Sequence, residues 1–120
     1  MIYKYNKLVR DKVPNQINSK KGKKAIYRVL SEEEYLQELN NKLIEEAHEF
    51  IEANSIEELA DVMEVIISIM EQKGFSLEEV REARAKKNTQ RGGFKDRLFF
   101  GMCRRERNKY RRARNQIINK

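Results

Sequence analysis

The segment LIEEAHEFIEANSIEELADVMEVIISIMEQ, residues 43–72, decides the fold of this chain. Its apolar residues recur at helical spacing on both sides of Asn54, which indicates two helices joined by a very short connection. The segment holds nine acids and no lysine or arginine, whereas ten of the chain's 26 basic residues precede it and sixteen follow it. We therefore expect these acids to lack cations in their own helices, and some of them to find a cation elsewhere. Oxygen-rich clusters on rigid elements are typical of magnesium sites.

Three capping signals divide the middle of the chain into helices. In a Ser-x-x-Glu pattern, the hydroxyl and the carboxylate each satisfy a backbone N–H that the first helical turn leaves without a partner. The pattern occurs at Ser31 with Glu34, at Ser55 with Glu58 and at Ser76 with Glu79. It predicts helices over residues 32–53, from residue 56 to a stop at Gly74, and from residue 77 to about residue 89. We expect neighbouring helices to pack antiparallel across the short connections, and the second helix to be the most buried.

The two ends of the predicted bundle are less regular. Asp11 is placed to cap a short helix that contains Pro14 in its first turn and ends before Gly22. Residues 25–30 are rich in β-branched and aromatic side chains, which indicates a short strand or an extended arm. Residues 94–100 offer an apolar patch that is suited to sealing the end of the bundle.

The composition favours an all-α protein. Of 120 residues, 38% are charged and 39% are hydrophobic, which suits amphipathic helices better than a sheet buried on both faces. We predict an antiparallel helical bundle over residues 1–100, with a basic C-terminal extension over residues 101–120. A chain of this length gains from partner subunits, so we expect a homodimer or a higher homo-oligomer.

Cysteine usage and hydropathy bear on where the protein works. Cys103 is the sole cysteine, so the chain forms no internal disulfide, and a reducing compartment is expected. The longest apolar run, residues 62–70, is too short to span a bilayer, and no signal peptide precedes it. We predict a cytoplasmic protein without a membrane partner.

The C-terminal extension has the strongest charge bias. Residues 101–120 hold eight basic residues against the single acid Glu106, within a net charge of +7. A basic tail attracts polyanions, so one hypothesis is a helical module that binds nucleic acid through this tail. The alternative, which is commoner for a charge run of this length, is a solvated segment without a partner.

Two acidic motifs lie on either side of Asn54. Residues three apart on a helix share a face, so Glu46 and Glu49 project together, as do Glu58 and Asp61. If the two helices are antiparallel neighbours, these four carboxylates converge, and a Mg²⁺ ion, or Mn²⁺ in its place, keeps them ionised.

Ordinary structural roles compete with this interpretation of the acids. Glu58 is placed to complete the cap of Ser55, Glu46 is placed to pair with Lys42, and acids on helical surfaces are common. His48, the only histidine, and the cations Lys7 and Lys12 are interpreted as surface residues.

The segments Lys42-Leu-Ile-Glu-Glu-Ala-His-Glu-Phe50 and Glu57-Glu-Leu-Ala-Asp-Val62 resemble the metal-binding core of the all-α nucleoside triphosphate pyrophosphohydrolases. This superfamily includes MazG-type enzymes, dimeric dUTPases and phosphoribosyl-ATP pyrophosphohydrolase. The flanking Asn6-Lys-Leu-Val-Arg-Asp-Lys-Val-Pro14 and Arg91-Gly-Gly-Phe94 are most similar to the small phosphoribosyl-ATP pyrophosphohydrolase-like and MazG-like members. The resemblance covers roughly residues 5–98.

The resemblance implies roles for particular residues. The metal-binding acids are Glu46, Glu49, Glu58 and Asp61. Glu45 becomes a helper acid or base, and either Glu45 or Glu49 orients or deprotonates the attacking water. The residues implied to contact substrate are Arg10, Lys87, Asn88 and Arg91.

The implied reaction is hydrolysis of a nucleoside triphosphate to pyrophosphate and a nucleoside monophosphate. Phosphoribosyl-ATP and a house-cleaning nucleotide are both possible substrates. The chain departs from many MazG domains in the gap between Glu49 and Glu58, which is only eight residues long. This departure leaves the shape of the pocket and the choice of substrate open, and a metal-binding homologue without catalysis is a further alternative.

Overall fold

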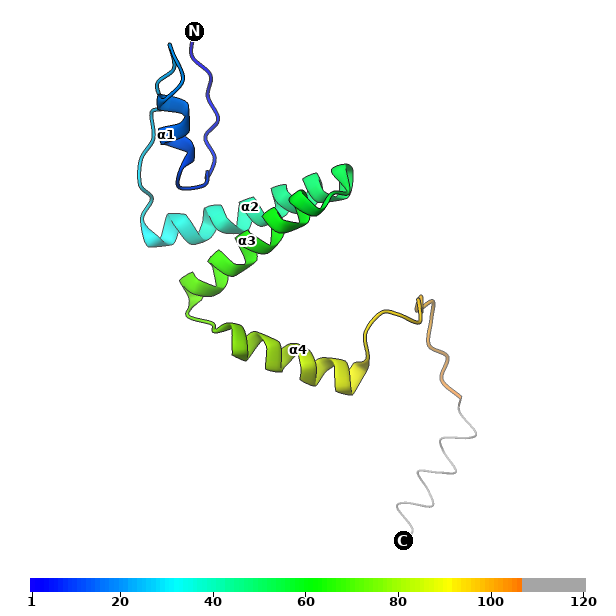
Figure 1. The fold of residues 1–120 in the computed structure, drawn as a ribbon. Coiled ribbons are helices and arrows are strands. Elements are labelled where there is room, and N and C mark those ends of the chain that lie inside the picture. The colour runs from blue at the N-terminus through cyan, green and yellow to red at the C-terminus, as the bar shows by residue number, and fades with distance from the viewer. Residues whose placement is uncertain (107–120) are drawn as a thin grey trace. The chain divides into compact units, whose positions relative to one another are not determined.

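The computed structural model describes residues 1–106, which contain four helices and no strand. The helices are α1 (Val13–Asn18), α2 (Glu32–Ala53), α3 (Ile56–Lys73) and α4 (Leu77–Arg91), shown in Figure 1. The prediction of an all-α protein is therefore confirmed for the described part of the chain, and residues 25–30 form an extended arm rather than a strand. The chain divides into two compact units, Met1–Ala85 and a second that begins at Lys86.

Helix α2 has the bounds that its capping signals predict. Ser31 Oγ accepts a hydrogen bond from the Glu34 backbone N–H at 3.2 Å, and the Glu34 carboxylate accepts one from the Ser31 N–H at 3.5 Å. Arg28, on the extended arm, donates to the same carboxylate at 2.8 Å. The guanidinium of Arg28 and the N–H of Ser31 lower the pKa of Glu34 to about 2. At its other end, α2 stops at Asn54, which takes the left-handed conformation at φ 52°.

The other predicted helix boundaries are close to those observed. Ser55 Oγ caps α3 by accepting from the Glu58 N–H at 3.3 Å, and Gly74, at φ 75°, ends that helix in the left-handed conformation. Ser76 and Glu79 form a reciprocal cap at the start of α4. Helix α4 continues to Arg91, two residues beyond the predicted end.

The predicted cap of α1 is wrong. The residue before the helix is Lys12 rather than Asp11, and it makes no side-chain capping hydrogen bond. A cap at Asp11 would make Pro14 the third helical residue, and proline lacks one of the two backbone N–H groups from which the Asp11 carboxylate could accept a hydrogen bond. The helix instead begins at Val13, with Pro14 next to it, and ends before Gly22 as predicted.

Helices α2 and α3 fold back on each other at the Asn54 turn (Figure 1) and form the main helix–helix contact of residues 1–85. The predicted antiparallel pairing is confirmed for these two helices, whereas the pairing predicted across Gly74 is wrong, because within residues 1–85 α3 and the first part of α4 do not pack along each other. Among residues 1–106, the only buried apolar residues are Leu39 on α2 and Val65 on α3. The core of this unit is therefore a thin layer between two helices.

Two expectations about burial are wrong. Helix α3 is not the most buried helix, because α2 covers only one side of α3. The apolar side chains on the remaining sides of α3 are exposed. Those exposed side chains are Ile56, Leu59, Met63, Ile66 and Ile67. The apolar patch of residues 94–100 does not seal a core, since Phe94, Leu98, Phe99 and Phe100 are 81–98% exposed.

None of the helices found in residues 1–106 has the length and apolar character needed to cross a bilayer. Cys103 is exposed and carries a free thiol. The predicted basic extension lies mostly outside the described residues. The hypothesis that it binds nucleic acid therefore stays a prediction.

Candidate metal centre

Three carboxylates from two helices gather beside the Asn54 turn. Glu46 comes from the C-terminal half of α2, and Glu58 and Asp61 come from the start of α3. One oxygen of each lies within 4.8 Å of the others. Mg²⁺ binds oxygens at about 2.1 Å in an octahedron, where neighbouring ligand oxygens are about 3 Å apart. Small side-chain rotations are therefore enough to bring these three oxygens onto one ion.

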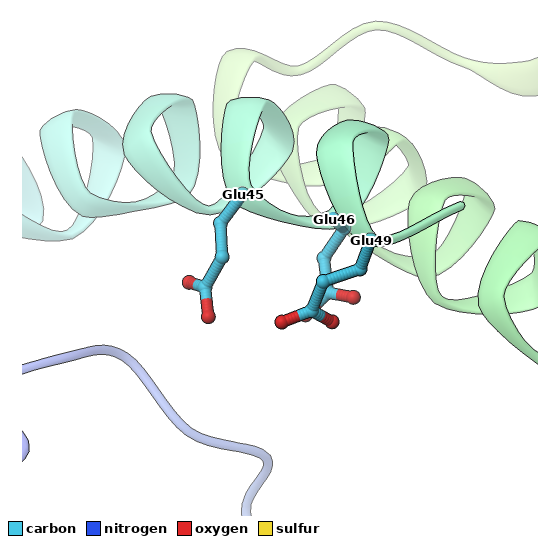
Figure 2. Close-up of side chains that lie close together, drawn as sticks. All are labelled: Glu45, Glu46 and Glu49. Atoms are coloured by element: carbon cyan, nitrogen blue, oxygen red, sulfur yellow. The ribbon is translucent and has the colours of Figure 1, made fainter. Parts of the chain in front are cut away.

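A second group shares Glu46 with the first. Glu45, Glu46 and Glu49 also place one oxygen each within 4.8 Å of one another, and Figure 2 shows their side chains extending from the same side of α2. Glu49 is exposed and joins the cluster through Glu46. Of the four acids expected to converge, Glu46, Glu58 and Asp61 form one group across the turn. The fourth, Glu49, lies at the edge of this group, next to Glu46.

Glu46 is the buried charged residue of the described chain, with 7% of its surface exposed. Its Oε1 lies 3.2 Å from Lys42 Nζ, but its Oε2 is buried without a hydrogen-bond partner in residues 1–106. Burial raises the pKa of Glu46 above its ordinary value, although the ammonium of Lys42 opposes this effect. A buried carboxylate oxygen without a partner is costly, so this atom is the feature of the cluster that most needs a physical explanation.

Glu58 carries the second buried oxygen without a partner. Its Oε2 has none among the described residues, and its carboxylate does not return to the backbone of Ser55 to complete a reciprocal cap. The caps at Ser31 and Ser76 are both reciprocal. The side chain of Glu58 therefore differs from its two counterparts in facing the acids instead of the helix start, and the capping role weighed for this carboxylate is wrong.

Lys42 corrects the expectation that the acids lack cations in their own helices. It immediately precedes the acidic segment, and its ammonium lies 3.3 Å from Glu45 Oε2 and 3.2 Å from Glu46 Oε1. Only 17% of its side chain is exposed. The pairing of Glu46 with Lys42, weighed from their spacing, is thus confirmed. One ammonium is shared by two carboxylates, so the cluster keeps an excess of negative charge.

The N-terminal segment brings two further cations to the acids. Arg10 Nη2 lies 2.6 Å from Asp61 Oδ1, and Lys7 Nζ lies 3.6 Å from Glu45 Oε1. Arg10, chosen from the sequence as a phosphate ligand, therefore lies at the acid cluster. Lys7, interpreted as a surface charge, is a neighbour of the cluster that the sequence interpretation missed. Its only signal was its position three residues before Arg10.

The remaining predicted site residues lie on α4. Lys87, Asn88 and Arg91 occupy exposed positions in the unit that begins at Lys86. The Asn88 carbonyl accepts the Gly92 N–H at 2.8 Å, which ends the helix. Their role in substrate binding stays a prediction, and His48 is exposed, in accord with its interpretation as a surface residue.

No protein-family model, curated protein or solved structure matches the chain. A function therefore has to be inferred from the residues of the cluster and their geometry.

Proposed function

We propose that this chain is a magnesium-dependent nucleoside triphosphate pyrophosphohydrolase, which releases pyrophosphate and a nucleoside monophosphate. The observation that carries the proposal is the pair of buried, unpartnered oxygens, Glu46 Oε2 and Glu58 Oε2, which belong to a three-acid group spanning two helices. Carboxylates that serve only a helix surface stay in water, where each oxygen finds a partner. Carboxylates that hold a cation have a reason to be buried and close together.

The first part of the proposal concerns the metal. Glu46, Glu58 and Asp61 are the ligands that would hold Mg²⁺, and Mn²⁺ is an accepted substitute because both ions prefer oxygen donors. Glu49 would complete the set from the edge of the cluster. Bound there, the ion supplies charge neutralisation for a phosphoryl group and lowers the pKa of a coordinated water.

The second part concerns the protein groups that act on the substrate. Phosphoryl transfer depends mainly on positioning and on neutralising charge, so cations beside the metal are needed. Arg10 is the candidate at the cluster, because a planar guanidinium grips phosphate with two hydrogen bonds. We propose Glu45, whose side chain is one-third exposed, as the group that orients or deprotonates the attacking water, and Glu49 is the alternative for this role. Phosphoribosyl-ATP or a house-cleaning nucleotide is the proposed substrate, with Lys87, Asn88 and Arg91 as further contacts.

A nucleotide panel tests this function. We expect the purified full chain with Mg²⁺ to release pyrophosphate from at least one nucleotide, and Glu58→Gln and Asp61→Asn to reduce that release by more than a hundredfold. Glu57→Gln is the matched control, because it removes an exposed carboxylate adjacent to Glu58 and should keep full activity. Activity that survives both site substitutions would rule out these acids. Metal binding without hydrolysis of any nucleotide would identify a homologue that has lost catalysis.

The proposal includes a homo-oligomer. In the unit Met1–Ala85, two buried apolar residues form too small a core to stabilise a domain, while α3 exposes the apolar residues named above. The exposed sides of α3 cannot be covered by α2, which already occupies one side. A second copy of the same helix pair supplies matching apolar sides and completes a four-helix bundle, the usual arrangement for such pairs.

Light scattering coupled to size-exclusion chromatography tests the oligomer. We expect the wild-type mass to be at least twice that of the chain, and Met63→Glu to shift it toward the monomer, because Met63 is 56% exposed on α3. Glu64→Gln is the matched control at the next position. A monomeric wild-type protein at micromolar concentration would rule out the proposed assembly.

A further inference from the structure

The segment before α1 is attached to the acid cluster through a contact between residues that are far apart in the sequence. Arg10 and Asp61 are separated by 51 positions, and their side chains meet at 2.6 Å. Lys7, on the same segment, lies against Glu45 of α2. The two cations thus tie the N-terminal segment to both helices that carry the proposed metal ligands.

We propose that Arg10 and a divalent cation compete for Asp61, so that binding of the cation releases the N-terminal segment and frees the guanidinium for phosphate. This inference rests on the proposed metal site and adds its regulation. Arg10 then has two alternative partners, a carboxylate of the cluster and a phosphate of the substrate.

The competition follows from charge and from shared oxygen atoms. Asp61 belongs to the group of three acids with oxygens within 4.8 Å of one another, so a cation held by that group lies within a few ångströms of the Arg10 guanidinium. Like charges at this separation repel strongly when solvent is partly excluded. Arg10 also occupies Oδ1 of Asp61, which is one of the two oxygens that a metal could use. Each cation therefore weakens the binding of the other.

Exposure decides which cation of the cluster can be displaced. The side chains of Arg10 and Asp61 are 60% and 36% exposed, whereas the side chain of Lys42 is 17% exposed beside the buried Glu46. An exposed ion pair changes an equilibrium by at most about fivefold. Lys42 has little freedom to leave, but Arg10 is held weakly and its side chain can reach solvent. The N-terminal segment is consequently the part of the unit that responds to the cation.

The guanidinium is suited to both partners. Its fixed fork of N–H donors matches the two oxygens of a carboxylate and equally those of a phosphate. Released from Asp61, Arg10 remains on a segment that ends at α1, so it stays near the acids rather than being lost from the site. A phosphate that approaches the metal would meet this free cation.

Manganese titration of the full chain by calorimetry tests the competition. We expect Arg10→Ala to bind Mn²⁺ about three to five times more tightly than wild type, because a competing charge and a competing ligand are removed. Arg10→Lys keeps the charge and should stay within about twofold of wild type. Lys12→Ala is the matched control: it removes a positive charge two residues away that makes no ion pair among the described residues, and it should bind like wild type.

Tryptic cleavage at the Lys7–Leu8 bond reports whether the segment is released. We expect Mn²⁺ to accelerate this cleavage several-fold in wild type, relative to cleavage after the exposed Arg104 in the same sample. Glu58→Gln, which lacks a proposed ligand, should show no acceleration. Mn²⁺ binding of equal affinity in wild type and Arg10→Ala would overturn the inference and leave the metal site standing. Absence of Mn²⁺ binding in both proteins would overturn the metal site and the inference together.

Discussion

Replacing Glu46 by glutamine should separate the stability of the fold from its capacity to bind a cation. The substitution keeps the shape of the side chain but changes one carboxylate oxygen into an amide nitrogen. Glu46 Oε2 and Glu58 Oε2 are both buried without partners in the described chain. The new amide can donate to the orphaned oxygen of Glu58, and the repulsion between the acids falls. We therefore expect Glu46→Gln to be more stable than wild type when no divalent ion is added.

The size of the gain can be estimated from the geometry. Two unit charges 4.8 Å apart repel by about 3.5 kcal/mol at an effective dielectric constant of about 20. Solvent reduces this value, because Asp61 is 36% exposed and the two acids on α3 are only partly buried. The substitution also weakens the ion pair with Lys42, which costs about 1 kcal/mol but leaves Lys42 its contact with Glu45. The net gain is about 1 kcal/mol, or about 4–8 °C in Tm for a unit of this size.

Manganese should reverse this order of stabilities. A cation at one hundred times its Kd stabilises the folded wild-type chain by about 2.7 kcal/mol, and Glu46→Gln should gain almost nothing. Thermal unfolding followed by circular dichroism, with Mn²⁺ and with a chelator, measures both effects. Glu57→Gln is the control, because it removes an exposed acid of the same helix pair and should retain the Mn²⁺ response. The reasoning is refuted if Glu46→Gln is less stable than wild type in chelator, or if Mn²⁺ stabilises both proteins equally.

Two further predictions concern the ends of the helices that carry the site. The pKa of Glu34 is lowered to about 2 from an ordinary 4.5, so its ion pair with Arg28 stabilises α2 above about pH 4.5 and is lost as the pH falls toward 2. In an acid titration followed by circular dichroism, Glu34→Gln should remove this part of the pH dependence. Gly74→Ala should lower the free energy of unfolding by about 1 kcal/mol, because Gly74 has φ 75°, a left-handed conformation that strains alanine. The added Cβ meets nothing within 4 Å, so no steric clash contributes to this loss. Gly93→Ala, which has equal space and no left-handed φ, should be nearly neutral in the same thermal unfolding experiment, and equal losses at both positions would exclude backbone strain as the cause.

The helices were predictable because their boundaries depend on local interactions. A serine hydroxyl caps the first turn of the helix that follows it wherever that helix lies, so the start of α2 at Ser31 and the start of α3 at Ser55 followed from the sequence alone. The cap of α1 was mispredicted for an equally local reason, since Pro14 removes one of the two N–H groups from which Asp11 could have accepted a hydrogen bond. The burial of α3 was not predictable, because the apolar pattern of a helix does not say how many neighbours cover it.

The candidate site was predictable in its membership but not in its contacts. Helical spacing placed Glu46 on one face, Glu58 and Asp61 on another, and the short turn implied that the faces meet. No local rule indicates that Arg10 reaches Asp61 across 51 positions, because the segment that carries Arg10 has no regular structure. Nor does spacing say which oxygen of Glu46 remains without a partner, since that depends on where Lys42 places its ammonium.

The balance of charge around the cluster supports the proposal that it binds a divalent ion. Five carboxylates belong to the two acid groups, and three cations lie on them, namely Lys7, Arg10 and Lys42. This excess of two negative charges rises to three when the proposed cation displaces Arg10 from Asp61, and one Mg²⁺ or Mn²⁺ neutralises two of the three. A second ion would have to bring its own anionic ligands, and the phosphates of a nucleotide are such ligands.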